Sequence, residues 1–304
     1  MADSELGERL VDAVQAATGE HPGHRVLHAK GVGAAGRFRS SGAAAPLTTA
    51  AHLQAGVTTP VQARFSNGSA DPDAPDGARD GRGFATKFRL ADGTSTDLVT
   101  LSLPVFFVRD PDDFVEFVAA RRPDPATGEL DLDKVLAFLG AHPEAQLAAE
   151  LSVAAPAPVS YSRVTYHSVH VFWLVGPDGA RHPVRYRWEP AAGDAGLTDE
   201  QAVAAPPDYL ADALADDLAA GPVRFDLVVV LGTEGDPVGD ATAPWPDDRP
   251  TVVAGTLELT GLADVDALIF DPTRVTSGIE CSDDPILAAR SAAYGVSFAR
   301  RRPG

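Results

Sequence analysis

Arg290 and Tyr294 are the two residues of this chain whose types and spacing could do chemistry together. They stand four positions apart in a stretch, from about Asp284 to Tyr294, whose pattern predicts a helix, so their side chains share one face. In an ordinary amphipathic helix such a pair is a packed tyrosine and a solvated arginine. The chemical alternative is a phenolate ligand for iron. A free tyrosine titrates near ~10, so ionising it at neutral pH needs Fe³⁺ and a neighbouring cation, which Arg290 would supply.

His28 is a second candidate, in the stretch RVLHAKGVG over residues 25–33. Arg25 stands three residues before it, and Gly31 and Gly33 follow, which would let the backbone approach something flat. An imidazole titrates near working pH and can accept and return a proton. A histidine among apolar residues is more often a packed core residue, so this stretch alone does not decide between the two interpretations.

The spacing of the other histidines argues against a metal site. A proline and a glycine between His21, His24 and His28 prevent a helix that would put them on one face, and no fourth ligand lies nearby. His167 and His170 stand three apart in a predicted strand and point to opposite faces. The sequence also has no P-loop, dinucleotide fingerprint, GxSxG elbow or HExxH motif, which removes many familiar enzyme classes.

Composition sets the broad class. The chain has 304 residues, of which 44% are hydrophobic and 22% charged, as in soluble globular proteins. A formal net charge of −18 argues against nucleic acid and anionic membrane surfaces as partners. No apolar run reaches ~18 residues, so no spanning helix is expected, and no secretory signal pattern is present. Cys281 is the lone cysteine, which excludes an intrachain disulfide and a thiolate cluster. We therefore expect a cytoplasmic protein.

The apolar patterns predict an α+β protein with an antiparallel sheet or barrel. Helices are expected within 1–20, over 110–121, 131–151 and about 284–294, and from Tyr209 to a stop at Gly221. Strands are expected at 23–36, in hairpins between 57 and 110, and at 163–175, 183–188, 222–232 and 251–261. Residues 295–304 are expected to form a basic tail. Without a repeat or a linker, residues 1–304 should be a single domain.

Six stretches, in order, resemble the haem catalase superfamily, and most closely its small, catalase-related peroxidase branch. They are RVLHAKGVGAAGRF (25–38), ARFSNGS (63–69), DGRGFATKF (80–88), DLVTLSLPVFFVRDPDDF (97–114), FDPTRVTSGIECSDDPIL (270–287) and ARSAAY (289–294). Their order and spacing cover nearly the whole chain. The resemblance implies an antiparallel eight-stranded β-barrel with surrounding α-helices, in a minimal form that lacks the C-terminal domain of large catalases. It also implies a homo-oligomer, a dimer or higher.

The cofactor that the resemblance implies is haem b, ferric and ligated by tyrosinate. Tyr294 matches the iron ligand and Arg290 its charge partner, and anionic ligation favours the ferric and higher oxidation states. Arg25, Arg64 and Arg301 match arginines that hold the haem propionates, where bidentate contacts are strongest.

On the peroxide side, the resemblance assigns His28 as the general base that moves a proton between the two peroxide oxygens. Ser66 matches the serine that hydrogen-bonds the other ring nitrogen and fixes the tautomer. Leu27 stands beside the histidine, and Phe106 and Phe114 match aromatic residues over the haem and in the access channel.

One position departs from the family. Where true catalases have an asparagine that orients peroxide, this chain has Leu101, between Thr100 and Ser102. A leucine offers no hydrogen bond, so the second peroxide should be poorly held. We therefore expect a peroxidase with weak or no catalase activity, active in oxidative stress. It would reduce organic peroxides or hydrogen peroxide through a ferryl intermediate, with a small organic electron donor, and its apolar pocket favours alkyl hydroperoxides.

Three alternatives stay open at this point. The first is a haem-dependent isomerase or dehydratase of fatty-acid hydroperoxides, as in allene-oxide-forming relatives, which would consume no donor. The second is a catalase proper. The third is a non-enzymatic haem carrier or sensor, in which His28 is only a packed residue.

Overall fold

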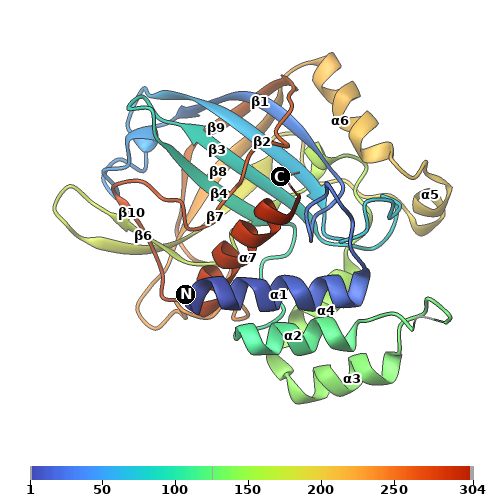
Figure 1. Cartoon of the computed structure of the whole chain (residues 1–304). Helices are drawn as coiled ribbons and strands as arrows, with labels where there is room; N and C mark the ends of the chain where they lie inside the picture. Colours follow the sequence, from blue (N-terminus) through green and yellow to red (C-terminus); the bar gives the residue numbers. More distant parts are fainter. Residues whose placement is uncertain (1, 125, 302–304) are drawn as a thin grey trace.

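A closed barrel of antiparallel strands dominates the molecule (Figure 1). The computed structural model describes residues 2–124 and 126–301. Its strands are β1 (Gly31–Ser40), β2 (Thr58–Asn67), β3 (Arg82–Arg89), β4 (Ser95–Leu101), β5 (Tyr166–His167), β6 (Phe172–Val175), β7 (Arg181–Pro190), β8 (Val223–Leu231), β9 (Thr251–Leu262) and β10 (Ile279–Cys281).

The strand order explains how the barrel closes. The described strands form one sheet in the order β10-β6-β7-β5-β4-β3-β2-β1-β9-β8, and β7 also pairs with β8. That pairing joins the eight strands from β7 round to β8 into a ring, and β6 and β10 extend beyond β7. All these pairs are antiparallel, which confirms the predicted eight-stranded antiparallel barrel.

Helices cover the outside of the barrel. They are α1 (Ala2–Thr18), α2 (Pro111–Ala120), α3 (Leu132–Ala141), α4 (Gln146–Ala154), α5 (Asp199–Ala204), α6 (Tyr209–Ala220) and α7 (Pro285–Arg301), with short 3-10 turns η1 (Ala51–Leu53), η2 (Pro143–Ala145) and η3 (Tyr161–Arg163). Helices α1, α2, α3 and α7 gather on one side, with α1 crossing α7, whereas α5 and α6 lie on another side (Figure 1). None of the described helices has the length and apolar character needed to cross a membrane.

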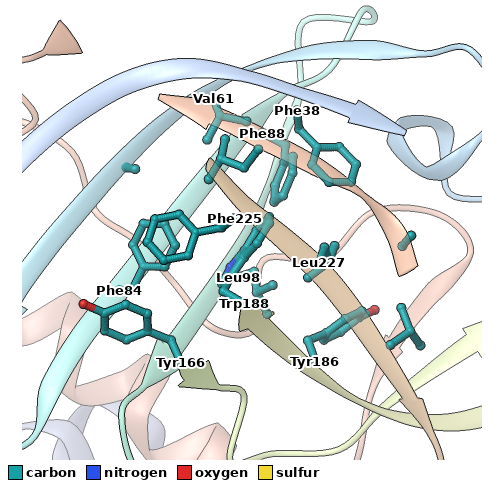
Figure 2. Packing of buried hydrophobic residues seen from close by; sticks show 14 of the residues in the cluster. Phe38, Val61, Phe84, Phe88, Leu98, Tyr166, Tyr186, Trp188, Phe225 and Leu227 are labelled. Atoms are coloured by element: carbon teal, nitrogen blue, oxygen red, sulfur yellow. The ribbon is translucent and has the colours of Figure 1, made fainter. Parts of the chain in front are cut away.

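Aromatic side chains fill the barrel interior (Figure 2). Strands alternate their side chains between two faces, and β2 and β3 send Phe65 and Phe84 inward. The two rings stack with centroids 4.3 Å apart and planes at 2°. Phe225 and Trp188 close the same cluster, and Trp188 is completely buried. Burial of such large rings is the main favourable term for this core.

The opposite faces of β2, β3 and β4 are buried as well, because α1 and α7 lie over them. Their outward residues, among them Arg64, Ala85 and Val99, line a cavity together with Leu10 of α1 and Ala293 of α7. Residues of these three strands are therefore buried on both faces, which explains their near-continuous buried pattern.

Two predicted helix boundaries are wrong. The helix expected over 131–151 is interrupted, because Pro143 cannot donate a helical hydrogen bond and forces the preceding His142 out of the helical region, to φ −122° and ψ 76°. The expected basic tail is wrong over 295–301, where α7 continues to Arg301. Phe298 and Arg301 stand four and seven positions after Tyr294, so they extend the same helix face. Residues 302–304 lie outside the described part of the chain.

Two predicted strands also differ from the structure. The strand expected at 23–36 begins only at Gly31, since His28 has a φ of +56°, outside the extended region. The strand expected at 163–175 is split into β5 and β6. Between them, the Ser168 hydroxyl donates to the His170 carbonyl and accepts from the Tyr186 amide, which replaces regular ladder bonds.

We predict that Gly36→Ala destabilises the fold by about 2 kcal/mol, the usual cost of overpacking. Gly36 lies at the bulge where β1 pairs with β9, and a Cβ there would overlap the Glu258 carbonyl oxygen. Gly261→Ala, in β9, is the matched control, since a Cβ at that position meets open space. Urea unfolding measures both variants, and equal midpoint losses would contradict the prediction.

Candidate active site

The structure brings all the residues singled out from the sequence into one cavity under α1 and α7. Its lining includes His28, Ser66, Arg25, Leu27, Arg64, Phe106, Phe114, Arg290, Tyr294 and Arg301. Leu10, Val11 and Val14 of α1 and Phe298 of α7 complete its walls. The cavity is thus mostly apolar, with a few polar groups at defined places, as binding sites for planar organic cofactors require.

His28 and Ser66 form the first polar pair of the cavity. His28 Nδ1 lies 3.1 Å from Ser66 Oγ, so the serine orients the ring and engages Nδ1 rather than Nε2. Gly83 of β3 makes this contact possible, because a Cβ there would lie 2.6 Å from Ser66 Oγ and 3.0 Å from His28 Nδ1. Register places Gly83 opposite Ser66, so three segments meet at this point.

The backbone of His28 is held in a strained conformation. Its φ of +56° is the one positive value among the described non-glycine residues. The His28 amide donates to the Gly68 carbonyl at 3.3 Å, and Arg64 donates to the His28 carbonyl at 3.0 Å and to the Ala29 carbonyl at 3.2 Å. Such strain persists only where the surroundings fix it, and it marks functional positions.

Behind this pair lies a buried polar network that no local sequence pattern predicts. Asn67 donates to Asp76 at 2.6 Å and accepts from the Tyr161 hydroxyl at 2.9 Å. Asp76 also accepts from the Leu210 amide at 2.8 Å and lies 3.4 Å from the Lys30 ammonium. The network ties the segments that carry His28 and Ser66 to the start of α6. Its bonded partners are up to 134 positions apart, and no spacing rule links them.

Arg290 and Tyr294 form the second polar pair. The Arg290 guanidinium donates to the Tyr294 hydroxyl at 2.9 Å and, through its other terminal nitrogen, to His170 Nε2 at 2.8 Å. His170 Nδ1 in turn lies 2.6 Å from a carboxylate oxygen of buried Asp284, whose other oxygen accepts from the Ile286 amide at the start of α7. His170 is therefore part of the site as a hydrogen-bond partner, although its spacing to His167 suggested no role.

Burial and neighbouring charges set the protonation of these histidines. Burial, followed by the charges of Arg64 and Arg290, lowers the pKa of His28 to about 3. Burial likewise lowers the pKa of His170 to about 4, although Asp284 acts in the opposite direction. Both rings are therefore neutral at physiological pH, so His28 is ready to accept a proton.

Three arginines, Arg25, Arg64 and Arg301, reach the cavity from different segments. Arg25 and Arg301 both donate to the Leu268 carbonyl, at 3.3 and 2.8 Å, which holds them together at one edge. Burial lowers the pKa of Arg64 to about 9, which leaves it charged at neutral pH. Clustered guanidinium groups of this kind suit carboxylate groups of a ligand.

The expected role of the glycines in RVLHAKGVG is wrong. A Cβ at Gly31 would meet the Arg64 guanidinium and the Phe65 carbonyl. A Cβ at Gly33 would meet the Ala263 carbonyl and the Val265 side chain. Neither glycine lines the cavity. They allow β1 to pack closely against its neighbours and do not bring the backbone to a ligand.

Comparison with known proteins now identifies the family. Residues 7–303 match the family model described as Catalase. The chain belongs to the catalase family. It is 34% identical to a catalase-related peroxidase of Synechococcus elongatus, over 98% of this chain and 89% of that protein. It is 37% identical to a catalase-related peroxidase of Mycolicibacterium paratuberculosis, over 97% of this chain and 94% of that protein.

Solved catalase structures share the fold. A bacterial catalase superposes with a TM-score of 0.84 at 26% identity, over 93% of this chain and 58% of that one. Catalase A from Saccharomyces cerevisiae superposes with a TM-score of 0.84 at 28% identity, over 93% of this chain and 62% of that one. This chain thus spans about three fifths of the solved catalases it matches.

The catalase family implies a haem cofactor, and the cavity fits one. A tyrosine hydroxyl that accepts from a guanidinium, Tyr294 with Arg290, is a donor suited to a ferric ion. The apolar walls suit a porphyrin, and Arg25, Arg64 and Arg301 suit its carboxylates. These residues present no chemistry that conflicts with such a cofactor.

Leu101 lines this catalase-type cavity, and the hydroxyl groups of its two neighbours in the sequence have partners in the strands. Thr100 donates its hydroxyl proton to the Phe84 carbonyl at 2.6 Å, and the Ser102 hydroxyl accepts from the Arg82 amide at 2.9 Å. Both flanking side chains are thus engaged in strand contacts. The wall of the cavity at this position is apolar.

We predict that stability falls as the pH drops below about 6.5. Four histidines have pKa values lowered by burial to about 3 or 4: His28, His52, His167 and His170. Below pH ~6.5 these four rings bind protons in the unfolded chain but stay neutral in the folded one. The free energy of unfolding is therefore highest above that pH. It decreases toward pH ~4 by up to ~1.4 kcal/mol per pH unit for each ring. Urea unfolding between pH 7 and 4.5 measures this, and His52→Gln, outside the cavity, should reduce the slope. An unchanged slope in that variant would refute the prediction.

Proposed function

We propose that this protein is a haem-dependent peroxidase with weak or no catalase activity. It reduces organic peroxides or hydrogen peroxide with electrons from a small organic donor. The observation that supports this most directly is one apolar cavity that holds both polar pairs, His28 with Ser66 and Arg290 with Tyr294, and has Leu101 in its wall.

His28 and Ser66 handle the proton of the peroxide. Because Nδ1 faces Ser66, His28 Nε2 accepts the proton from one peroxide oxygen and returns it to the other oxygen as the O–O bond breaks. The low pKa of His28 keeps the ring neutral and available as a base. The strained backbone and its hydrogen bonds hold the imidazole in one position, so little reorganisation is needed.

Haem b, ferric and ligated by the Tyr294 phenolate, is the cofactor in this proposal, and when bound it supplies an iron that takes up the oxidising equivalents of the peroxide. Arg290 would stabilise the negative charge of the phenolate through its 2.9 Å hydrogen bond. The guanidinium is itself balanced by Asp284 through His170. Arg25, Arg64 and Arg301 would hold the propionates.

Leu101 favours alkyl hydroperoxides over hydrogen peroxide. The apolar wall excludes a second water-like molecule that needs an oriented hydrogen bond, and it provides contact for an alkyl group. The hydroxyl groups of Thr100 and Ser102 beside it are engaged in strand contacts. The oxidised enzyme would then be reduced by an organic donor instead of by a second peroxide, as in a catalase.

A homo-oligomer, one domain, a cytoplasmic location and a role in oxidative stress stay predictions from the sequence and the resemblance. Light scattering of the purified protein and imaging of a tagged copy check the first and third of these.

Two substitutions test the proposed function. Tyr294→Phe should abolish the tyrosinate-type ferric spectrum of the haem-loaded protein, because a phenyl ring cannot ligate iron. His28→Ala should keep that spectrum but lose at least ~100-fold in the rate of peroxide-dependent donor oxidation, the usual contribution of a general base.

An unchanged ferric spectrum in Tyr294→Phe would contradict the proposed ligation of iron by Tyr294. Full activity in His28→Ala would show that this histidine has only a packing role. Product analysis is the control for reaction class. A rearranged lipid hydroperoxide with no donor consumed would indicate an isomerase instead.

Leu101→Asn should raise oxygen evolution from hydrogen peroxide, since an amide restores a hydrogen bond to the second peroxide. An oxygen electrode measures the rate, and the rate of alkyl hydroperoxide reduction should fall at the same time. Leu101→Val, which keeps an apolar wall, is the control. If Asn and Val variants evolve oxygen equally, the side chain at this position does not limit dismutation.

A further inference from the structure

We propose a second site, for a divalent metal ion, outside the cavity, formed by Asp113, His142 and Glu144. Asp113 comes from α2, His142 follows the last residue of α3, and Glu144 belongs to η2. One ligand atom from each of the three lies within 4.8 Å of the others. The break at Pro143 turns His142 and Glu144 toward α2, so this site depends on the helix interruption that the sequence pattern missed.

The spacing of the donor atoms is close to that of a coordinated ion. His142 Nδ1 lies 3.9 Å from Asp113 Oδ2 and 3.6 Å from Glu144 Oε1. Three ligands at ~2.1 Å from one ion, at angles of ~90–110°, would be ~3.0–3.5 Å apart. The two distances from His142 Nδ1 exceed this range by only a few tenths of an ångström, and the Asp113 and Glu144 ligand atoms lie within 4.8 Å of each other, so modest side-chain shifts would bring the atoms to bonding positions.

The two carboxylates have few partners apart from His142. The Asp113 and Glu144 side chains are 25% and 12% exposed, and neither accepts a hydrogen bond from another residue of the described chain. Besides His142, the neighbouring cation is Arg109, whose Nε lies 3.7 Å from Glu144 Oε1 and whose side chain is 60% exposed. Two partly buried carboxylates that share one imidazole and one exposed arginine are costly, and a bound cation would offset that cost.

The negative charges around His142 favour binding of a metal ion between these side chains. Asp110 and Glu116 add their negative charges to those of Asp113 and Glu144 around His142. Glu116 Oε2 lies 3.4 Å from His142 Nε2, so Glu116 can accept from this nitrogen while Nδ1 faces the two proposed carboxylate ligands. Carboxylates commonly orient metal-bound histidines in this way.

One imidazole nitrogen and two carboxylate oxygens suit first-row divalent ions such as Zn²⁺ and Mn²⁺, with water in the remaining positions. The ion would join α2 to the α3–η2 segment. His142 stacks on Phe138 with ring centroids 4.2 Å apart, and the centroids of Phe138 and Phe117 of α2 are 5.6 Å apart. Asp113 directly precedes Phe114, which lines the cavity, so the ion would fix the helix that carries a wall of the active site.

Calorimetric titration of the full-length, haem-loaded protein with Zn²⁺, after removal of metals by a chelator, tests the site. We expect one ion per chain with micromolar affinity, and a rise in Tm of about 5 °C at a hundredfold excess over Kd. Asp113→Asn and Glu144→Gln should each weaken binding at least tenfold. Asp112→Asn is the matched control, because the neighbouring Asp112 pairs with Arg9 at 2.5 Å instead, and it should bind like the unmodified chain.

Absence of stoichiometric binding would overturn the site and leave an ion-paired imidazole in its place. Equal weakening by Asp112→Asn would show a diffuse attraction of the acidic surface, and undiminished binding in both Asp113→Asn and Glu144→Gln would place the ion elsewhere. Asp113, His142 and Glu144 do not line the haem cavity, so failure of the metal site would leave the proposed haem binding and peroxide reduction standing.

Discussion

Burial of strands β2, β3 and β4 on both faces is the constraint on which the rest of the structure depends. One face supplies Phe65 and Phe84 to the barrel core, and the other supplies Arg64, Ser66 and Leu101 to the cavity. Side-chain alternation makes the two sets inseparable, because a slip of one residue would exchange them. The dense aromatic core therefore fixes the register of the strands, and this register fixes the geometry of the site.

Electrostatic balance supports the same arrangement. The cavity holds several arginines in apolar surroundings, where an unpaired charge would be costly. Arg290 meets this constraint through His170 and Asp284, and Arg64 through the carbonyl groups of His28 and Ala29. Each contact also orients a residue proposed for chemistry, so charge compensation and positioning are achieved by the same hydrogen bonds.

The sequence predicted the barrel and the residues that line the cavity because both depend on local signals. Alternating apolar runs identified the strands, and the i, i+4 pair Arg290 and Tyr294 needed only a helix. It did not predict features that depend on distant partners. The break at Pro143 overrode a continuous apolar pattern, and the extension of α7 to Arg301 follows from packing of Phe298 against the cavity. His170 and Asn67 acquire their roles from residues 94 or more positions away, including Arg290 and Tyr161.

Helix α1 supplies Leu10, Val11 and Val14 to the cavity, and α7 supplies Ala293 and Phe298. Gly7 allows the two helices to approach closely, since a Cβ there would lie 2.7 Å from the Ala292 carbonyl oxygen. The enclosure is thus closed by two helices from distant parts of the sequence, and their mutual packing is part of the pocket wall. Any change that loosens the contact between α1 and α7 would therefore also loosen the hold of the pocket on a bound cofactor.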